Sequence, residues 1–251
     1  MNLARDVWLL TGRSIREVIR QPVIEVGNIF IPLFFFFVNL GVFKNVAEGA
    51  FGVSDYAGFA LAAAILQGVS NTSAGQGIVS DIQKGYFDKL VLTPVARPAL
   101  VLGRMATDGL RGIVLAAVII GVGMLAGASI ESGPIGVLVI LAMSALFSIA
   151  YSGIAVALAL RTASPQAVQL SFLLFFPLIF LSPAFAPRSV FTGWLDFLAT
   201  INPVTYVLEG MRSLVLDGWE GERLGKAMAA MGGMAAFTLG LVLAAYRWRK
   251  L

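Results

Sequence analysis

Residues 132–160 read SGPIGVLVILAMSALFSIAYSGIAVALAL, a run of 29 residues without an Asp, Glu, Lys or Arg. A helix needs about 20 mainly apolar residues to cross the hydrocarbon of a bilayer, and one charge at its centre costs about 2.5–3.5 kcal/mol. This run is therefore long enough and apolar enough to form a transmembrane helix.

The chain has five further charge-free windows of similar length. They are 26–43 (18 residues), 56–80 (25), 112–130 (19), 162–187 (26) and 227–246 (20). The next longest window near the C-terminus, 197–208, has only 12 residues, which is too few to span. We therefore predict an all-α integral membrane protein of one domain, 1–251, with six transmembrane helices.

Composition supports this class and excludes several kinds of chemistry. Hydrophobic residues make up 58% of the chain and charged residues 13%, against about 45–50% and about 25% in a typical soluble domain. The chain contains no Cys and no His. A thiolate nucleophile, a disulfide framework, a zinc finger and a Ser-His-Asp triad are therefore excluded.

The basic residues predict the orientation. With both termini in the cytoplasm, 13 of the 18 basic and 6 of the 14 acidic residues lie inside, which gives a net charge of +7 inside and −3 outside. The positive-inside rule favours this arrangement in the cell membrane. The basic excess then indicates contact with anionic membrane lipid. The sequence contains no Arg/Lys run with interleaved aromatic residues, so it gives no indication of nucleic-acid binding.

Residues 3–20 predict an interfacial helix that precedes the first span. Apolar residues such as Trp8 and Ile15 fall on one half of the helical wheel, and Arg5, Arg13 and Arg16 fall on the other. A helix of this kind lies in the membrane surface with its arginines towards lipid phosphates.

The inner half of the second predicted span is unusually polar. It contains Gln67, Ser70, Asn71, Thr72, Ser73 and Gln76. Such groups must face protein or water when they lie in a membrane. They therefore indicate either a translocation pathway or ordinary interhelical hydrogen bonding, and the residues alone leave both interpretations open.

A cytoplasmic loop, 81–106, follows the second span. Its pattern predicts a short amphipathic helix over 86–92 that ends before Pro94. Further on, Arg104, Asp108 and Arg111 have helical spacing, so we expect them to pair with one another. Glu25, near the inner end of span 1, has two interpretations, contact with substrate or contact with a nearby arginine or water, and we expect the second.

The external segment 184–225 predicts two short helices between spans 5 and 6. Apolar residues recur at helical spacing on both sides of Asn202-Pro203. Asn202 suits a helix N-cap, Pro203 the first helical position and Gly218 the end of the helix. Each helix is too short to span, so the pair is expected to dip into the outer leaflet or to lie on its surface.

These features together resemble the membrane subunit of type-2 ABC exporters, the family of daunorubicin-resistance-type drug permeases and polysaccharide or lipid export permeases. The resemblance covers essentially the whole chain. Its best local matches are Lys84-Gly85-Tyr86-Phe87-Asp88-Lys89-Leu90 with Thr93-Pro94-Val95, and Leu181-Ser182-Pro183-Ala184-Phe185 with Asn202-Pro203-Val204-Thr205-Tyr206. Glu209 and Arg212 follow where the family often has an acid and an arginine. The drug-exporter branch usually has a small pair such as Gly-Thr at Gly85-Tyr86, which leaves the sub-branch open.

The resemblance implies a division of labour between subunits. The chain lacks the Gly-x-x-x-x-Gly-Lys phosphate loop, so ATP and Mg would be bound by a separate ATPase subunit, present in two copies. The chain itself would be non-enzymatic and would form a homodimer. The loop after span 2 would act as the coupling helix on the ATPase, with Gly85, Tyr86, Phe87, Asp88, Lys89, Leu90, Thr93 and Pro94 as its residues.

The resemblance also implies a translocation path between spans 2 and 5 for a hydrophobic or amphiphilic substrate such as a drug, lipid or glycoconjugate. Its candidate residues are Gln67, Asn71, Gln76, Phe172, Phe175 and Phe176. The external gate would comprise Asn202, Pro203, Tyr206, Glu209 and Arg212. Simple helix capping and interface anchoring also account for Asn202, Pro203 and Tyr206, and a local pair accounts for Glu209 and Arg212.

Other function classes remain as alternatives. An ion-coupled secondary transporter would need an ionisable group within a span, and the six windows lack one. An integral-membrane enzyme would need converging carboxylates or a lysine site, because His and Cys are absent. A non-transporting assembly subunit would be distinguished by a loop 85–92 that stimulates no ATPase activity in a partner.

Overall fold

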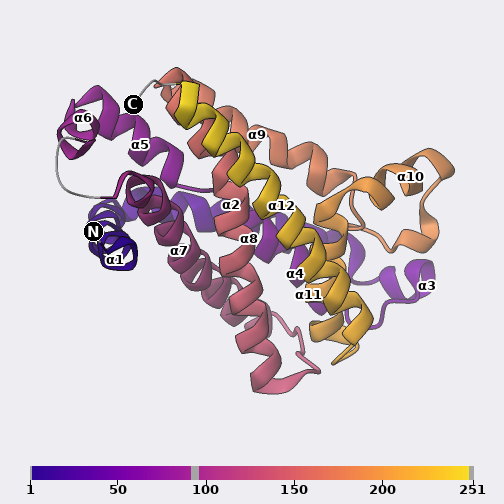
Figure 1. Ribbon diagram of the computed structural model, residues 1–251. Coiled ribbons are helices and arrows are strands. Elements are labelled where there is room, and N and C mark those ends of the chain that lie inside the picture. Colours follow the sequence, from indigo (N-terminus) through magenta and orange to yellow (C-terminus); the bar gives the residue numbers. More distant parts are fainter. Residues whose placement is uncertain (1, 92–95, 249–251) are drawn as a thin grey trace.

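The computed structural model describes residues 2–91 and 96–248, and this part of the chain is almost entirely helical (Figure 1). Its elements in chain order are α1 (Leu3–Ile19), α2 (Pro22–Phe43), α3 (Ala47–Phe51), α4 (Tyr56–Val69), α5 (Ala74–Gln83), α6 (Tyr86–Val91), α7 (Arg97–Leu125), α8 (Gly133–Thr162), α9 (Pro165–Phe180), the 3-10 helix η1 (Arg188–Val190), α10 (Gly193–Ile201), α11 (Pro203–Leu216) and α12 (Gly221–Trp248). The predicted all-α fold is confirmed for these residues.

The long helix α8 is the centre of the bundle. It packs along α7 on one side and along α12 on the other, while α4 and α11 fill the space beside them. Side chains of Phe147 and Tyr151 from α8 and Phe175 from α9 form a fully buried aromatic cluster, with ring centroids 5.6–6.2 Å apart. Aromatic contacts of this kind add to the stability that area burial alone provides.

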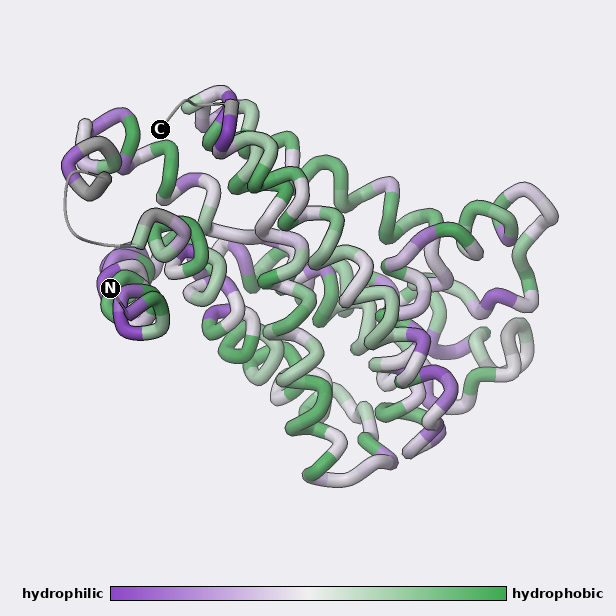
Figure 2. The backbone as a smooth tube through the Cα atoms, viewed as in Figure 1, coloured by the Kyte–Doolittle hydropathy of each residue, from purple (hydrophilic) through white to green (hydrophobic). Residues whose placement is uncertain are grey.

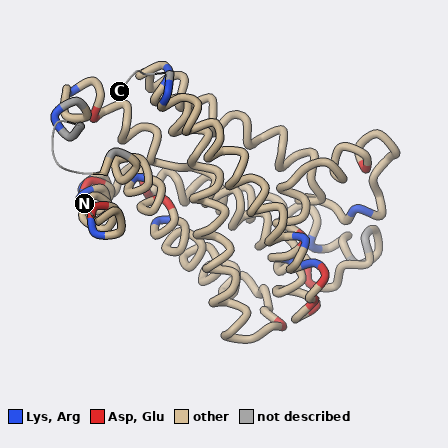
Figure 3. The backbone as a smooth tube through the Cα atoms, viewed as in Figure 1, with Lys and Arg blue, Asp and Glu red and all other residues tan. Residues whose placement is uncertain are grey.

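The charged residues gather at the two ends of the bundle. One end holds α1, α6 and the last turns of α12, and the other holds α10 and the start of α12 (Figures 1 and 3). Between these ends the helices are mostly hydrophobic (Figure 2). An apolar band between two charged ends is the distribution that a membrane-spanning protein requires.

Four described helices are long and apolar enough to cross a membrane: Pro22–Phe43, Pro98–Leu125, Gly133–Thr162 and Gly221–Arg247. The remaining two predicted spans differ in form. The second is not one helix but two, α4 and α5, separated at residues 70–73. The fifth is α9, whose 16 residues are shorter than a full span. A total of six spans therefore stays a prediction.

The predicted helix over 3–20 is present as α1, but its contacts differ from the expected ones. Its buried seam is Thr11 and Ser14, which pack against α7, and the Thr11 hydroxyl donates to the carbonyl of Gly103 at 3.2 Å. Arg13 does not face outwards, because it is drawn into ion pairs with carboxylates of α1 and α5. The exposed indole of Trp8 remains on the face available to lipid.

The two helices predicted between spans 5 and 6 are present as α10 and α11. They differ greatly in burial. Trp194 and Phe197 of α10 are exposed, whereas α11 is almost wholly buried against α4, α8 and α12. Gly218 has a positive φ of 87° and follows the end of α11, as predicted from its being a glycine.

Candidate functional site

Four charged side chains join three helices at the α6 end of the bundle. Arg104 of α7 donates to Glu17 of α1 and, at 2.6 Å, to Asp81 of α5. Arg13 of α1 donates to the same two carboxylates. We call Arg13, Glu17, Asp81 and Arg104 the ion cluster. Burial alone would lower the pKa of Arg13, but the hydrogen bond and charge of Asp81 outweigh this effect and raise it.

The short helix α6 follows the ion cluster directly. Gly85 has a positive φ of 66°, which turns the chain between α5 and α6. The Arg13 guanidinium lies 4.2 Å from the centre of the exposed Tyr86 ring, so α6 also contacts α1. The helix predicted over 86–92 is confirmed as far as Val91.

Not all of the predicted coupling residues face outwards. Tyr86 and Lys89 are exposed, but the Phe87 ring is buried in the chain's own core near Leu10 and Leu100. Phe87 therefore attaches α6 to α1 and α7 instead of forming an apolar anchor for another protein. Thr93 and Pro94 lie outside the described residues, as do the side chains of Asp88 and Leu90.

A cavity of about 710 Å³ opens beside the ion cluster. Its walls come from α1, α2, the α4–α5 break, α5 and α7, and it includes Asn71 and Gln76 from the predicted path. Inside it the Arg111 guanidinium donates to Glu25 at 2.7 Å and to the carbonyl of Asn71. The expected partner of Glu25 is thus confirmed to be an arginine.

The predicted path residues do not form one continuous surface. Gln76 donates to the carbonyl of Pro165 at 3.2 Å, so it joins α5 to α9. Gln67 is buried at a separate, narrow cavity of about 20 Å³ between α2, α4 and α9. Phe175 belongs to the buried aromatic cluster, and it does not line either cavity.

The other two aromatic path candidates share a face of α9. Phe172 and Phe176 meet edge to face with centroids 5.3 Å apart. The series continues through Phe180 to Phe185, in the turn after α9, with centroids 6.5 and 5.0 Å apart. A row of four partly exposed rings therefore follows the second half of α9 and the turn after it.

Three of the predicted gate residues make local and helix-capping contacts. The Asn202 carboxamide accepts from the N–H of Val204 at 3.0 Å and donates to the carbonyl of Leu178 at 2.6 Å. Pro203 begins α11, and the Tyr206 hydroxyl donates to the carbonyl of Thr200 at 2.6 Å. These contacts join α9, α10 and α11 at the end opposite α6.

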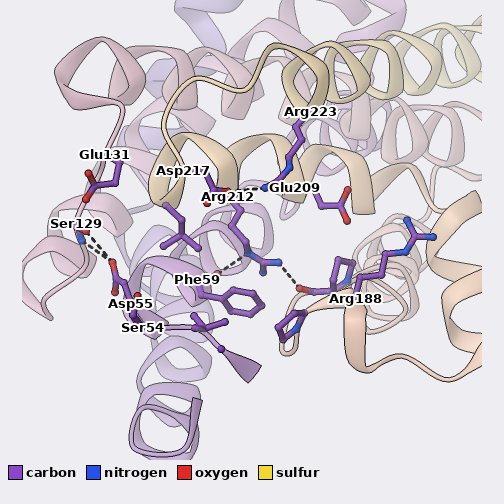
Figure 4. A pocket seen from close by; sticks show the side chains of 15 residues that line it. Ser54, Asp55, Phe59, Ser129, Glu131, Arg188, Glu209, Arg212, Asp217 and Arg223 are labelled. Carbon is purple, nitrogen blue, oxygen red and sulfur yellow. Dashed lines mark hydrogen bonds and ion pairs between the residues drawn. The ribbon is translucent and has the colours of Figure 1, made fainter. Parts of the chain in front are cut away.

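The remaining gate candidates, Glu209 and Arg212, line a cavity of about 600 Å³ at that opposite end (Figure 4). Arg212 donates to the carbonyls of Pro183 at 2.8 Å and Phe59 at 3.3 Å, and its guanidinium lies 3.5 Å from the centre of the Phe59 ring. The prediction of a local ion pair between Glu209 and Arg212 is therefore wrong. The Arg212 guanidinium points away from its own helix towards α4 and the turn after α9.

Ion pairs bound the same cavity on its exposed side. Arg223 donates to Asp217 at 2.7 Å (Figure 4), and Arg188 donates to Asp196. The hydrogen bond from Arg188 to Asp196 raises the pKa of this arginine. Both signs of charge line the cavity, so its electrostatics favour neither a cation nor an anion strongly.

The sequence was compared with known protein families, and one family matches it. The sequence model described as "ABC-2 type transporter" matches residues 5–216, which is most of the chain and includes the ion cluster, α6 and α11. The chain belongs to the ABC-2 type transporter family.

Individual relatives of this ABC-2 permease agree with the family match. The chain is 27% identical to a daunorubicin resistance ABC transporter permease protein of Streptomyces coeruleorubidus over 234 residues, 90% of this chain and 80% of the relative. It is 25% identical to a probable doxorubicin resistance ABC transporter permease protein of Mycobacterium tuberculosis over 93% of this chain and 82% of the relative. A putative transport permease of Pyropia yezoensis is 26% identical over 85% of this chain and 75% of the relative.

Several residues of this ABC-2 permease were not predicted as site residues. Arg13 and Glu17 have the i,i+4 spacing of a helical pair, but the contacts that bring in Asp81 and Arg104 span as many as 87 positions of sequence, so no local spacing could have linked all four. A second available signal was the charge of Arg104 at the entry to span 3. No ion pair is found among Arg104, Asp108 and Arg111, although the charge of Arg111 acts on Asp108. Their hydrogen bonds and ion pairs go instead to α1, α2, α5 and the α4–α5 break.

Proposed function

We propose that this ABC-2 permease is the membrane subunit of an ATP-driven exporter in the cell membrane, with both termini in the cytoplasm. It works as a homodimer with two copies of a separate ATPase subunit, which bind ATP and Mg. Its substrate is hydrophobic or amphiphilic, in keeping with the names of two relatives, which are drug-resistance permeases. The six predicted segments cross the membrane, with α4 and α5 together as the second.

The observation that carries the proposal is the ion cluster beside α6. In this proposal α6 is the coupling helix, and Tyr86 and Lys89 face the ATPase because their side chains are exposed. A displacement of α6 moves α5, and the Asp81–Arg104 ion pair transmits it to α7. Since Arg104 and Asp81 are both largely buried, this pair is less screened than a surface ion pair.

The polar cavity and the aromatic face of α9 suit the proposed substrate class. The cavity of about 710 Å³ has room for a polar head group, and Phe172 and Phe176 offer apolar contact on a separate face of α9. The external gate comprises the junction made by Asn202, Tyr206 and Arg212, since it closes the opposite end of the same helices. Opening the gate requires these contacts to change.

The test is to purify the chain with the ATPase subunit encoded beside it and to measure ATP hydrolysis in lipid nanodiscs. The double charge reversal Asp88→Lys with Lys89→Glu is expected to reduce stable complex or coupled hydrolysis at least fivefold. The matched control is Glu222→Lys with Lys226→Glu, which reverses an exposed pair at the opposite end. This control is expected to leave both the complex and hydrolysis within twofold of the wild type.

Two results would contradict the proposal. If the wild-type chain binds no ATPase subunit, the ABC assignment of its activity fails, and ion-coupled transport becomes the next hypothesis. If the reversal at Asp88 and Lys89 behaves like the control, α6 is not the docking element.

A further inference from the structure

The break between α4 and α5 lies against one face of α7. A continuous helix would pair its backbone groups internally, but at residues 70–73 the helix is interrupted between α4 and α5. Unpaired backbone groups cost several kcal/mol where water is excluded, so a break in a membrane helix must find partners elsewhere. The structure supplies these partners from two charged residues of α7.

Asp108 satisfies the α5 side of the break. Its carboxylate accepts three hydrogen bonds: from the N–H of Ser73 at 2.8 Å, the hydroxyl of Ser73 at 2.7 Å and the N–H of Ala74 at 2.9 Å. The Asp108 side chain is completely buried. A carboxylate at the start of a helix also interacts favourably with the helix dipole.

Arg111 satisfies the α4 side of the same break. Its guanidinium donates to the carbonyl of Asn71 and to the carboxylate of Glu25, in the first turn of α2. Asp108 and Arg111 are three residues apart on α7, so they lie on one face and hold the two ends of the break together.

The other end of α5 is held by the same face of α7. Arg104 lies four residues before Asp108 and pairs with Asp81 in the last turn of α5. Gly77 allows this close approach, because a Cβ at that position would lie 2.5 Å from an Arg104 nitrogen. α5 is thus attached to α7 at both ends, at Ser73–Ala74 and at Asp81.

We propose that Asp108 is a positioning residue that makes α5 and α6 one rigid lever on α7, pivoting at the α4–α5 break. Without its charge the start of α5 detaches from α7, and a push on α6 moves α5 without moving the bundle. The consequence for transport rests on the function proposed above, but the attachment of α5 does not.

The first test uses the permease alone in nanodiscs. Because the chain has no cysteine, Lys84→Cys at the end of α5 and Val114→Cys on α7 give two unique sites for spin labels. Asp108→Asn is expected to broaden the distance distribution between the labels at least twofold. Ser73→Ala removes one of the three hydrogen bonds and is expected to broaden it less.

The control is Ser144→Ala, which removes a buried hydroxyl that bonds only within α8 and is expected to leave the distribution unchanged. If Asp108→Asn does not fold, Ser73→Ala decides the question by itself. A wild-type distribution in the folded Asp108→Asn chain, or in Ser73→Ala where that is the only folded variant, would overturn the proposal.

The second test measures transport per ATP hydrolysed in the complex with the ATPase subunit. For Asp108→Asn we expect this ratio to fall at least fivefold, because hydrolysis continues while α5 no longer drives α7. An equal loss of transport and hydrolysis would show a general folding defect and overturn the lever. A wild-type complex that hydrolyses no ATP would refute the proposed function but leave the spin-label result intact.

Discussion

The guanidinium of Arg212 joins three segments that are far apart in the sequence. It lies on the Phe59 ring, 153 positions away, and donates to the carbonyls of Phe59, Pro183 and Ala184. Its planar fork provides several donors in fixed directions, which suits carbonyls that converge from different segments. This one side chain therefore connects α11 to α4 and to the turn after α9.

Replacing Arg212 is expected to destabilise the protein. Arg212→Ala removes hydrogen bonds from a charged donor and leaves buried carbonyls unpaired, so the free energy of unfolding should fall by about 3 kcal/mol. Arg212→Lys should recover only part of this loss, because an ammonium group cannot reach the three carbonyls together. Chemical unfolding in mixed micelles measures both.

The control is Arg223→Ala, which breaks exposed ion pairs with Asp217 and Glu220 and should cost less than about 1 kcal/mol. If Arg212→Ala and Arg223→Ala lowered the free energy of unfolding equally, the buried contacts of Arg212 would contribute no more to stability than exposed ion pairs.

Residues with local partners were predictable from the sequence, and residues with distant partners were not. The capping roles of Asn202 and Gly218 act within a few positions, so they followed from residue type, whereas the bond from Asn202 to the distant Leu178 carbonyl did not. Arg212 and Asp108 find their partners across 153 and 35 positions. Residue type predicts that such charges need partners, but only the fold decides which ones they meet.

The α5 helix has a face with little room for a larger side chain. Gly75 packs against the backbone of α8, where an added Cβ would lie 2.7 Å from the carbonyl oxygen of Ala155. A small residue is required here because the obstacle is main chain and cannot rotate away. Small residues permit this close approach between membrane helices generally.

Gly75→Ala is expected to lower the free energy of unfolding by about 1–3 kcal/mol through overpacking between α5 and α8. The matched variant is Gly121→Ala in α7, where no neighbouring atom lies within 4 Å of the added methyl. It should leave stability unchanged or raise it by up to about 1 kcal/mol, because alanine favours helix. The same unfolding assay measures both, and a loss no larger for Gly75→Ala than for Gly121→Ala would contradict the packing argument.

Helix existence followed from the sequence more reliably than helix continuity. Charge-free windows predicted apolar helices correctly, but the window 56–80 contains the polar run that becomes the α4–α5 break. Ser, Thr and Asn side chains compete for backbone hydrogen bonds, so such a run can either stay helical or leave the helix. The carboxylate of Asp108, supplied by another helix, makes the break stable here.

At the scale of the whole molecule, charge is divided between two ends with an apolar band between them (Figures 2 and 3). The proposed orientation predicts which end is cytoplasmic. In an otherwise cysteine-free chain, Glu131→Cys should react with a membrane-impermeant maleimide in intact cells. Lys84→Cys should react only after the cells are permeabilised.

The cysteine-free parent provides the background for this labelling. Both positions are exposed, so a difference between them reports side of the membrane and not burial. The reverse pattern would invert the predicted topology and place α6 outside the cell, which would also exclude contact with a cytoplasmic ATPase.

The burial of α11 has a consequence for biosynthesis. A chain leaves the ribosome from its N-terminus, so α11 is made before α12, yet α12 forms one wall of its site, with Gly210 close against Ala227. For that interval the newly made α11 carries Arg212 without the complete packing that surrounds it in the finished protein. Assembly of the end opposite α6 therefore has to finish after α12 has been made, even though α4 and α11 were synthesised earlier.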